Sequence, residues 1–330
     1  MGEFELIRRH FQRDDAPAAA RAAAARAGVV LGVGDDCALL EQATASAAPP
    51  PLQPLFAVST DMLIEGRHFF ADVDPASLGH KALAVNLSDL AAMGATPRAF
   101  TLALSLPTAD DAWLSAFARG LFSLADAHGA SLVGGDTTRG PLAICITVMG
   151  EVPAAQALRR DRARPGDEIW VSGALGAAAL AVRRRLAGTS LPPGHPALDR
   201  LERPQPRVAL GRSLVGIAHA AIDLSDGLAG DLGHVLERSG SGADLDVDSV
   251  PAHECLAGLD PLERASCVLA GGDDYELAFT APPAARAAVE AAGRACGVPV
   301  ARIGRITEAP GLRLRSSVPL PSLAPYDHFR

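Results

Sequence analysis

Short apolar runs alternate with segments of helical period along most of the 330 residues, and this alternation limits the possible folds more than any other feature. Short runs that end in Gly, Pro or Asp predict strands, whereas apolar residues three or four positions apart predict helices. Strands are expected at 56–60, 101–106, 131–135, 142–152, 168–173, 276–281, 300–306 and 312–316, and helices at 75–93, 109–128, 174–186, 205–219, 227–238 and 283–296. The pattern predicts the α/β or α+β class, in which sheets are layered with helices.

The length predicts two domains, because a domain typically takes about 150 residues. We place the boundary near residue 152, after an apolar strand, so that the domains are residues 1–152 and 153–330. A Pro-rich stretch at 44–54 is expected to be a surface loop.

The charge balance argues against nucleic acid as a partner. Thirty basic and 38 acidic residues give a net charge of −8, whereas phosphate backbones require a basic surface. The basic residues are 29 Arg and a single Lys, Lys81. Because Lys81 is followed by Ala82, the Gly-Lys-Ser/Thr pattern of a phosphate-binding P-loop is absent.

The remaining composition predicts a protein of the cytoplasm. No apolar run approaches the ~18 residues of a membrane span, so no membrane association is expected. The first residues are acidic where a secretion signal would be basic. The five Cys form no C-x-x-C pair and are expected to be free thiols.

Nine Asp residues stand out because of their neighbours. Most follow an apolar strand at a turn, where α/β sheets bind their ligands. They are Asp35 and Asp36 in GVGDD, Asp61 in STD, Asp136 in GGDTTR, Asp223 and Asp226 in DLSDG, Asp273 and Asp274 in GGDDYE, and Asp89. Asp89 lies in the predicted 75–93 helix, on an apolar stripe with Leu78, Val85 and Met93. A carboxylate is unfavourable there unless it is paired or binds a metal, so Asp89 is predicted to be functional.

Clustered carboxylates repel one another unless a cation compensates their charge. Mg²⁺ takes oxygen ligands and commonly bridges to substrate phosphates, while Gly residues let backbone N–H groups approach a phosphate. The acidic motifs therefore predict a site that binds a nucleotide through Mg²⁺ without a P-loop.

Simpler interpretations stand beside this one. Gly-Asp pairs are common in ordinary turns, and Asp223 and Asp226 have the spacing of residues that cap the 227–238 helix. His68 has the alternative role of a packed imidazole, and the Arg run at 183–185 is expected to be a solvated helix end.

Nine segments taken together resemble the thiamine-monophosphate kinase family. They are GEFELIRRHF, GVGDDCALL, VSTDMLIEGRHF, KALAVNLSDLAAMGATP, GGDTTRG, RPGDEIWVSG, IDLSDGL, GGDDYELAFT and YDHF, in the family's order from residue 2 to 329. The wider superfamily of aminoimidazole ribonucleotide synthetase shares only part of this set. This chain has Asp273 where many members of the family have Glu.

The resemblance implies a two-domain fold like that of aminoimidazole ribonucleotide synthetase, with the N-terminal sheet pairing with that of a second copy in a homodimer. ATP and several Mg²⁺ ions would lie between the domains. The reaction would be direct transfer of the ATP γ-phosphoryl group to the phosphate of thiamine monophosphate.

The resemblance also implies a role for individual residues. The Mg²⁺ ligands would be Asp36, Ser59 or Thr60, Asp61, Asp89, Asp136, Asp223 and Asp226. Contacts to ATP would come from Gly135, Asp136, Arg160 and Ser225, with Arg159 and Arg162 as competitors of Arg160. Thiamine monophosphate would be bound by His68, Asp273 and Tyr326.

Three other functions remain open from the residues alone. They are another ATP-dependent enzyme of the superfamily, a metal-dependent phosphohydrolase in which bound water replaces the acceptor, and a non-catalytic nucleotide-binding regulator. The predicted acceptor residues favour the kinase, since they belong to motifs with no part in holding ATP.

Overall fold

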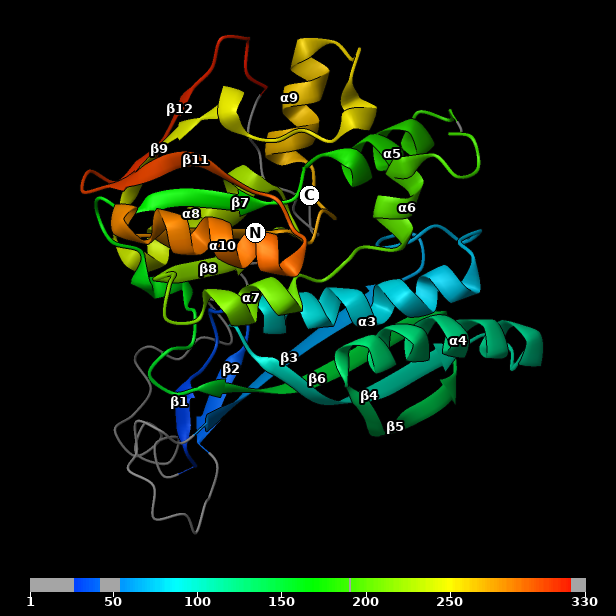
Figure 1. Ribbon diagram of the computed structural model, residues 1–330. Helices are drawn as coiled ribbons and strands as arrows, with labels where there is room; N and C mark the ends of the chain where they lie inside the picture. The colour runs from blue at the N-terminus through cyan, green and yellow to red at the C-terminus, as the bar shows by residue number, and fades with distance from the viewer. Residues whose placement is uncertain (1–26, 42–53, 190, 322–330) are drawn as a thin grey trace.

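The computed structural model describes residues 27–41, 54–189 and 191–321 and contains two six-stranded sheets with helices packed on them (Figure 1). One sheet comes from the N-terminal half of the chain and the other from the C-terminal half. This mixed architecture confirms the predicted fold class. The Pro-rich segment 44–54 lies almost entirely outside the described residues, and the two terminal motifs and Tyr326 lie wholly outside them.

The first sheet has the order β1-β2-β3-β6-β4-β5, and its neighbours are antiparallel except for the parallel pair β4 and β5. Its strands are β1 (Val29–Leu31), β2 (Ala38–Glu41), β3 (Pro54–Ile64), β4 (Thr96–Leu106), β5 (Ser131–Arg139) and β6 (Ala143–Pro153). The expectation that Asp61 and Asp136 follow strand ends is wrong. The backbone ladder continues through both, since Asp61 pairs with Ile146 and Asp136 with Ala103.

Helices α3 (Pro75–Ala92) and α4 (Asp111–His128) pack on one face of this sheet. The carboxylate of Asp74 accepts a hydrogen bond from the N–H of Ser77 and caps α3, which ends before Gly94 with its positive φ of 70°. Leu78, Val85 and Met93 are buried, as the predicted apolar stripe requires, but burial extends around α3 because the helix is enclosed between the first sheet and the C-terminal half. Between Ser77 and Ala92, only Asp89 is not fully buried.

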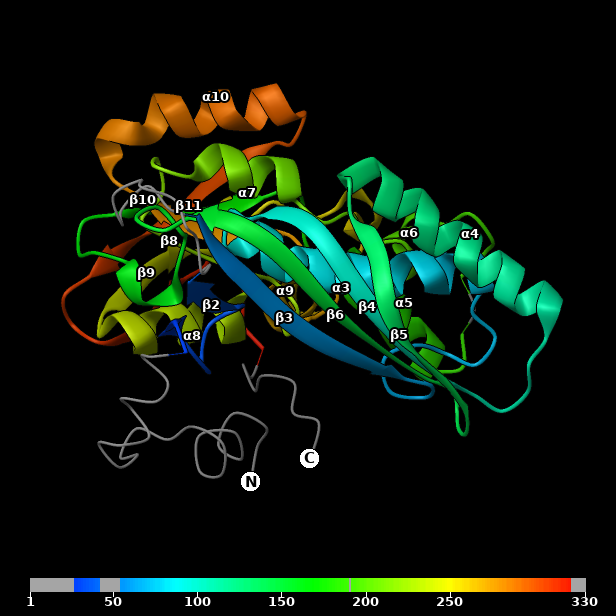
Figure 2. The ribbon, with the colours of Figure 1, turned by 90° about the horizontal axis from the view of Figure 1, so that it is seen from below.

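The opposite face of the first sheet is not covered by any described helix. Seen from below, β3, β6, β4 and β5 lie in front of α3 and α4 (Figure 2). Alternate residues of β3, namely Phe56, Met62 and Ile64, are exposed on this face.

The second sheet has the order β12-β9-β11-β7-β10-β8 and is antiparallel except for the pair β12 and β9. Its strands are β7 (Glu168–Ser172), β8 (Ala220–Asp223), β9 (Gly242–Asp246), β10 (Leu277–Ala281), β11 (Val300–Thr307) and β12 (Gly311–Arg315). The helices of this half are α5 (Ala177–Leu186), α6 (Pro196–Glu202), α7 (Val208–Leu214), α8 (Leu228–Ser239), α9 (Pro261–Ala270) and α10 (Arg286–Cys296), with short 3-10 turns η2 (Arg160–Arg162), η3 (Val247–Ser249), η4 (Glu254–Leu256) and η5 (Pro283–Ala285).

The apolar core joins the two halves. One cluster runs from the first sheet through α3 and α7 to one face of the second sheet, where the rings of Trp170 and Phe279 stack. A second cluster lies beneath α5, α8 and α9 on the other face. Helix α3 therefore lies at the junction of the two halves. None of the described helices combines the length and apolar character needed to cross a membrane.

Candidate functional site

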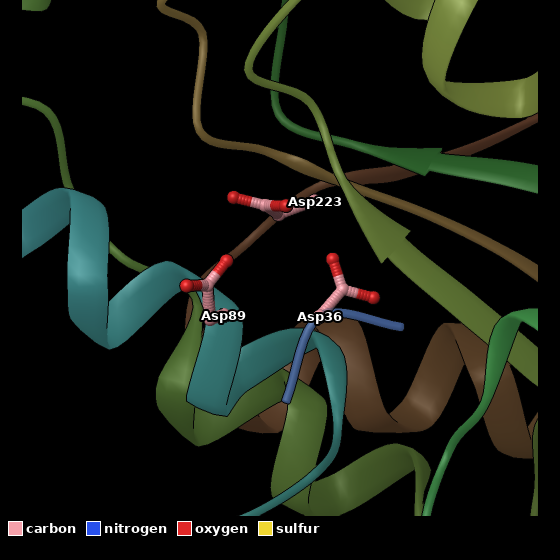
Figure 3. A group of neighbouring side chains, drawn as sticks. All are labelled: Asp36, Asp89 and Asp223. Atoms are coloured by element: carbon pink, nitrogen blue, oxygen red, sulfur yellow. The ribbon is translucent and has the colours of Figure 1, made fainter. Parts of the chain in front are cut away.

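Three carboxylates from distant parts of the chain meet beside α3. Asp36 lies between β1 and β2, Asp89 on α3 and Asp223 at the end of β8, and each offers an oxygen within 4.8 Å of the others. Their side chains converge on one space (Figure 3). The junction of the two halves thus assembles three of the predicted metal ligands.

Burial and the repulsion of neighbouring carboxylates disfavour the charged forms of Asp89, Asp223 and Asp35. The pKa of Asp89 is raised well above its usual value, first by burial and then by Asp61, Asp223 and Asp36. The pKa of Asp223 is raised in the same way, first by burial and then by Asp36. Burial, followed by the charge of Asp36, raises the pKa of Asp35 to about 7. Such a set of oxygen donors is suited to a divalent cation, which would restore the ionised forms.

Arg160 is the described cation in direct contact with this cluster. Its Nε and Nη2 donate to the two carboxylate oxygens of Asp36 at 3.0 and 2.6 Å. Its backbone is fixed as well, because its carbonyl accepts from Ser239 Oγ at 2.8 Å. Arg159 pairs instead with Asp161, and Arg162 donates to backbone carbonyls. Of the three candidates, Arg160 faces the carboxylates.

Ser59 and Thr60 are adjacent on β3, and their side chains lie on opposite faces of the first sheet. The hydroxyl of Ser59 donates to Asp89 at 2.5 Å, on the face that α3 covers. The hydroxyl of Thr60 bonds to that of Thr147 at 2.8 Å on the opposite face, because adjacent side chains of a strand point to opposite sides. Within one copy, Ser59 therefore lies beside the carboxylate cluster, and Thr60 lies on the uncovered face. Asp61 returns to the covered side, and its N–H donates to Asn86.

The turn that contains Ser225 and Asp226 is held by groups that the sequence did not single out. The buried carboxylate of Asp231 accepts from the N–H groups of Asp226 and Gly227 at 3.1 and 3.0 Å. No side chain caps the start of α8, so the simpler interpretation of Asp223 and Asp226 as caps is wrong. The Ser225 carbonyl accepts from the N–H of Asp273 at 2.9 Å, which joins this turn to the loop 271–276.

Loop 271–276 has a strained backbone. Asp273 and Tyr275 have positive φ angles of 66° and 49°, and they are the non-Gly residues with positive φ in the described part of the chain. This conformation is unfavourable for residues with a side chain and is typical of functional sites. The pKa of Tyr275 is raised by burial and then by Asp273, Asp61 and other carboxylates of the site.

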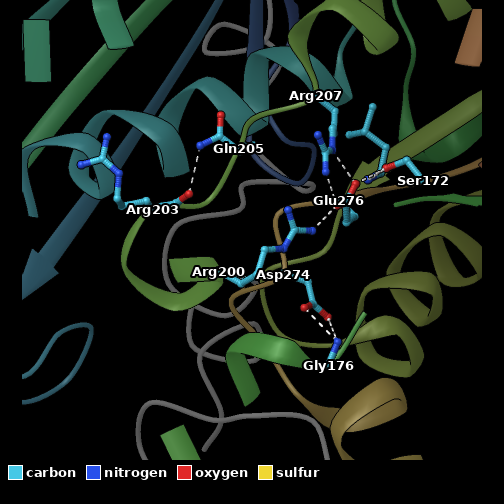
Figure 4. Close-up of polar contacts among 9 residues, drawn as sticks. Ser172, Gly176, Arg200, Arg203, Gln205, Arg207, Asp274 and Glu276 are labelled. Carbon is cyan, nitrogen blue, oxygen red and sulfur yellow. Dashed lines mark hydrogen bonds and ion pairs between the residues drawn. The ribbon is translucent and has the colours of Figure 1, made fainter. Parts of the chain in front are cut away.

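The loop is held by contacts with several elements. Asp274 accepts from the N–H of Gly176, and the fully buried Glu276 binds Ser172, Arg200 and Arg207 (Figure 4). The distances from Glu276 to Ser172 Oγ, Arg200 Nη2 and Arg207 Nε are 2.6, 2.5 and 2.6 Å. Sequence reasoning missed both arginines because neither lies in a motif.

The strand register places Asp136 on the face of the first sheet opposite the carboxylate cluster. One row of paired residues crosses the sheet from β5 to β3. It consists of Asp136 on β5, Ala103 on β4, Cys145 on β6 and Met62 on β3. Directly paired residues share a face of the sheet, so Asp136 belongs to the uncovered face with the exposed Met62. Within one copy, Asp136 and the carboxylate cluster thus lie on opposite faces of the first sheet.

The turn after β3 carries His68, whose Nδ1 accepts from the N–H of Ile64 at 3.0 Å. The following segment is bound from the C-terminal half by Arg185, which pairs with Asp72 and lies 4.4 Å over the ring of Phe70. The Arg run at 183–185 is therefore not simply a solvated helix end.

Comparison with known proteins identifies the class of this fold. The N-terminal domain model of AIR synthase related proteins matches residues 34–152, and the C-terminal domain model matches residues 164–317. The two sheets and the junction site thus belong to the AIR synthase-related class.

Individual relatives define the family within this class. The chain is 45% identical to thiamine-monophosphate kinase of Salmonella typhimurium, over 99% of this chain and 98% of the relative. A crystal structure of thiamine-monophosphate kinase from Stenotrophomonas maltophilia is 45% identical, with a TM-score of 0.77 over 94% of this chain and 96% of that one. A structure described as AaThiL complexed with AMPPCP and TMP is 27% identical, with a TM-score of 0.78 over 99% and 97%. The chain belongs to the thiamine-monophosphate kinase family.

Proposed function

We propose that this protein transfers the γ-phosphoryl group of ATP to thiamine monophosphate and releases thiamine diphosphate and ADP. The observation that carries the proposal is the convergence of Asp36, Asp89 and Asp223 at the junction of two domains, in a member of the kinase family. A relative of the same fold is described as complexed with AMPPCP and TMP, which supports a site for a nucleotide and an acceptor together.

The carboxylate cluster fits Mg²⁺, which prefers oxygen ligands and, when bound, neutralises phosphate charge. Asp36, Asp89 and Asp223 would hold it, with Ser59, Asp61 and Asp226 beside them. Ser59 fixes the orientation of the Asp89 carboxylate, and Arg160 fixes that of Asp36. We assign Arg160 and Ser225 to the phosphates of ATP.

We propose direct in-line transfer. An oxygen of the acceptor phosphate attacks the γ-phosphorus, and the bond to the β,γ-bridging oxygen breaks, so that ADP leaves with the electron pair. The acceptor phosphate is already an anion at neutral pH, so neither a covalent enzyme intermediate nor a strong general base is required. The chain's contribution is to position two anions that otherwise repel.

We propose that the active protein is a homodimer. The uncovered face of the first sheet exposes Phe56, Met62 and Ile64. Burial of these apolar side chains against a second copy would be energetically favourable. Gly135 and Asp136 also lie on β5 at the edge of that sheet. The assignment of Asp136 to ATP requires that a second copy bring it to its neighbour's cluster.

ATP turnover with and without thiamine monophosphate tests the proposal. We expect ADP formation to require thiamine monophosphate and to yield one thiamine diphosphate for each ADP. ATP hydrolysis at a rate indifferent to thiamine monophosphate would favour the phosphohydrolase, and binding of ATP without turnover would favour the regulator. Turnover with a different acceptor would indicate another enzyme of the superfamily.

A further inference from the structure

The single Lys of the chain is buried at the junction of the two halves. Lys81 lies on α3, its side chain is 3% exposed, and its Nζ lies 2.8 Å from Oδ1 of Asp273. A buried ammonium group is unfavourable without a partner, so this ion pair satisfies Lys81. The pair joins a helix of the N-terminal half to the strained loop 271–276.

The two carboxylate oxygens of Asp273 differ, because Oδ1 contacts Lys81 and Oδ2 does not. Its Oδ2 has no hydrogen-bond partner among the described residues, and 28% of the side chain is exposed. The Lys81 ammonium occupies Oδ1, and the oxygens of an ion-paired carboxylate act as hydrogen-bond acceptors. The free oxygen is therefore set to accept from an N–H group of a ligand.

Lys81 also relates Asp273 to the carboxylate cluster. It precedes Asp89 on α3 by eight residues, about 12 Å along the helix axis at 1.5 Å per residue. The N–H of Asp273 donates to the carbonyl of Ser225, in the turn that follows Asp223, so Asp273 also lies beside the turn that carries Asp226.

We propose that Lys81 is a positioning residue for the phosphoryl acceptor, because it fixes Asp273 with one oxygen turned to an N–H group of the acceptor's heterocycle. This inference rests on the proposed function, and it takes Asp273 as the residue that meets the aminopyrimidine of thiamine monophosphate. Lys81 acts through Asp273 and does not touch the reacting atoms.

Steady-state kinetics of the full chain test this role, with thiamine monophosphate and MgATP varied separately. We expect Lys81→Met to raise the KM for thiamine monophosphate about tenfold and to leave the KM for ATP within about twofold. Lys81→Arg retains the charge and should restore most of the affinity. The matched control is Arg286→Met, which removes the Arg286–Glu168 ion pair between α10 and β7 and should change neither KM.

A double variant keeps the test decisive if Lys81→Met does not fold. Adding Lys81→Met to Asp273→Asn removes both charges, and it should raise the KM for thiamine monophosphate no further than Asp273→Asn alone. Equal increases in both KM values, or a further increase in the double variant, would overturn the inference. A wild-type protein that turns over ATP but never phosphorylates thiamine monophosphate would instead refute the proposed function.

Discussion

At the scale of single residues, Asp89 combines burial, like charges and a hydrogen bond from Ser59. We expect Asp89→Asn to lower turnover by roughly 100-fold or more, equivalent to ~3 kcal/mol, because Asn keeps the shape but removes a charge that would bind Mg²⁺. The same variant should raise the unfolding temperature of the metal-free protein, because one of several repelling carboxylates is gone. Turnover and thermal unfolding measure the two effects.

Asp126→Asn is the control for that pair of measurements. Asp126 is exposed on the neighbouring helix α4, so its neutralisation should change neither turnover nor stability. Wild-type turnover by a folded Asp89→Asn protein would remove Asp89 from the metal site.

His80 gives the stability a dependence on pH. It is buried on α3 and bonds to the carbonyl of Pro204 at 2.8 Å, and burial lowers its pKa below 6.5. The unfolded chain therefore binds this proton more readily, so stability is lost as pH falls below about 6.5, by at most ~1.4 kcal/mol per pH unit. Urea unfolding of His80→Gln between pH 7 and 5 should show a smaller loss than the wild type; an equal loss would show that His80 contributes nothing.

At the scale of elements, α3 and α4 approach closely because each has a Gly at the contact. A Cβ on Gly79 would lie 2.0 Å from the carbonyl oxygen of Phe117, and one on Gly120 would lie 1.8 Å from that of Ala76. We expect Gly79→Ala to destabilise the protein by about 3 kcal/mol, since the helices would have to separate. Denaturant unfolding measures this change.

Gly233→Ala on α8 is the matched control, because no atom lies within 4 Å of its added Cβ. It should stabilise the protein by about 0.5–1 kcal/mol by restricting the unfolded chain. If both variants behaved alike, helix packing at Gly79 would not be limiting.

Predictability from the sequence also differs between elements. The start of α3 was predictable because Asp74 and Pro75 are local signals. The burial of α3 on nearly all sides was not, since it depends on the C-terminal half packing against the helix. The sequence prediction also missed several short elements, because too few residues carry their periodic pattern: the strands β1, β2, β8 and β9 and the helices α6 and α9.

The same distinction applies to the site. Asp36, Asp89 and Asp223 were predictable from motifs, and the structure brings them together. The separation of Ser59 from Thr60 and the remoteness of Asp136 depend on strand register and on the face of the sheet, which no motif specifies. Lys81 was visible as the single Lys, but its pairing with Asp273 requires the fold.

At the scale of the whole molecule, the position of Asp136 on the uncovered face predicts sites shared between two copies. Asp89→Asn and Asp136→Asn should each abolish turnover as pure dimers. Random mixing should restore about a quarter of wild-type turnover, because half of the dimers are mixed and each has one of two sites intact. Co-expression of two differently tagged variants measures this recovery, and either a monomeric mass in solution or inactive mixed dimers would contradict the shared site.

The central claim is direct phosphoryl transfer from ATP to thiamine monophosphate at the junction of the two halves. Its most direct test is a single turnover with ATP labelled at the γ-phosphorus, followed by separation of the products. The account predicts that the label appears in the terminal phosphate of thiamine diphosphate, at the rate at which ADP forms and without label in free phosphate. Label that appears first in inorganic phosphate or on the protein would contradict it.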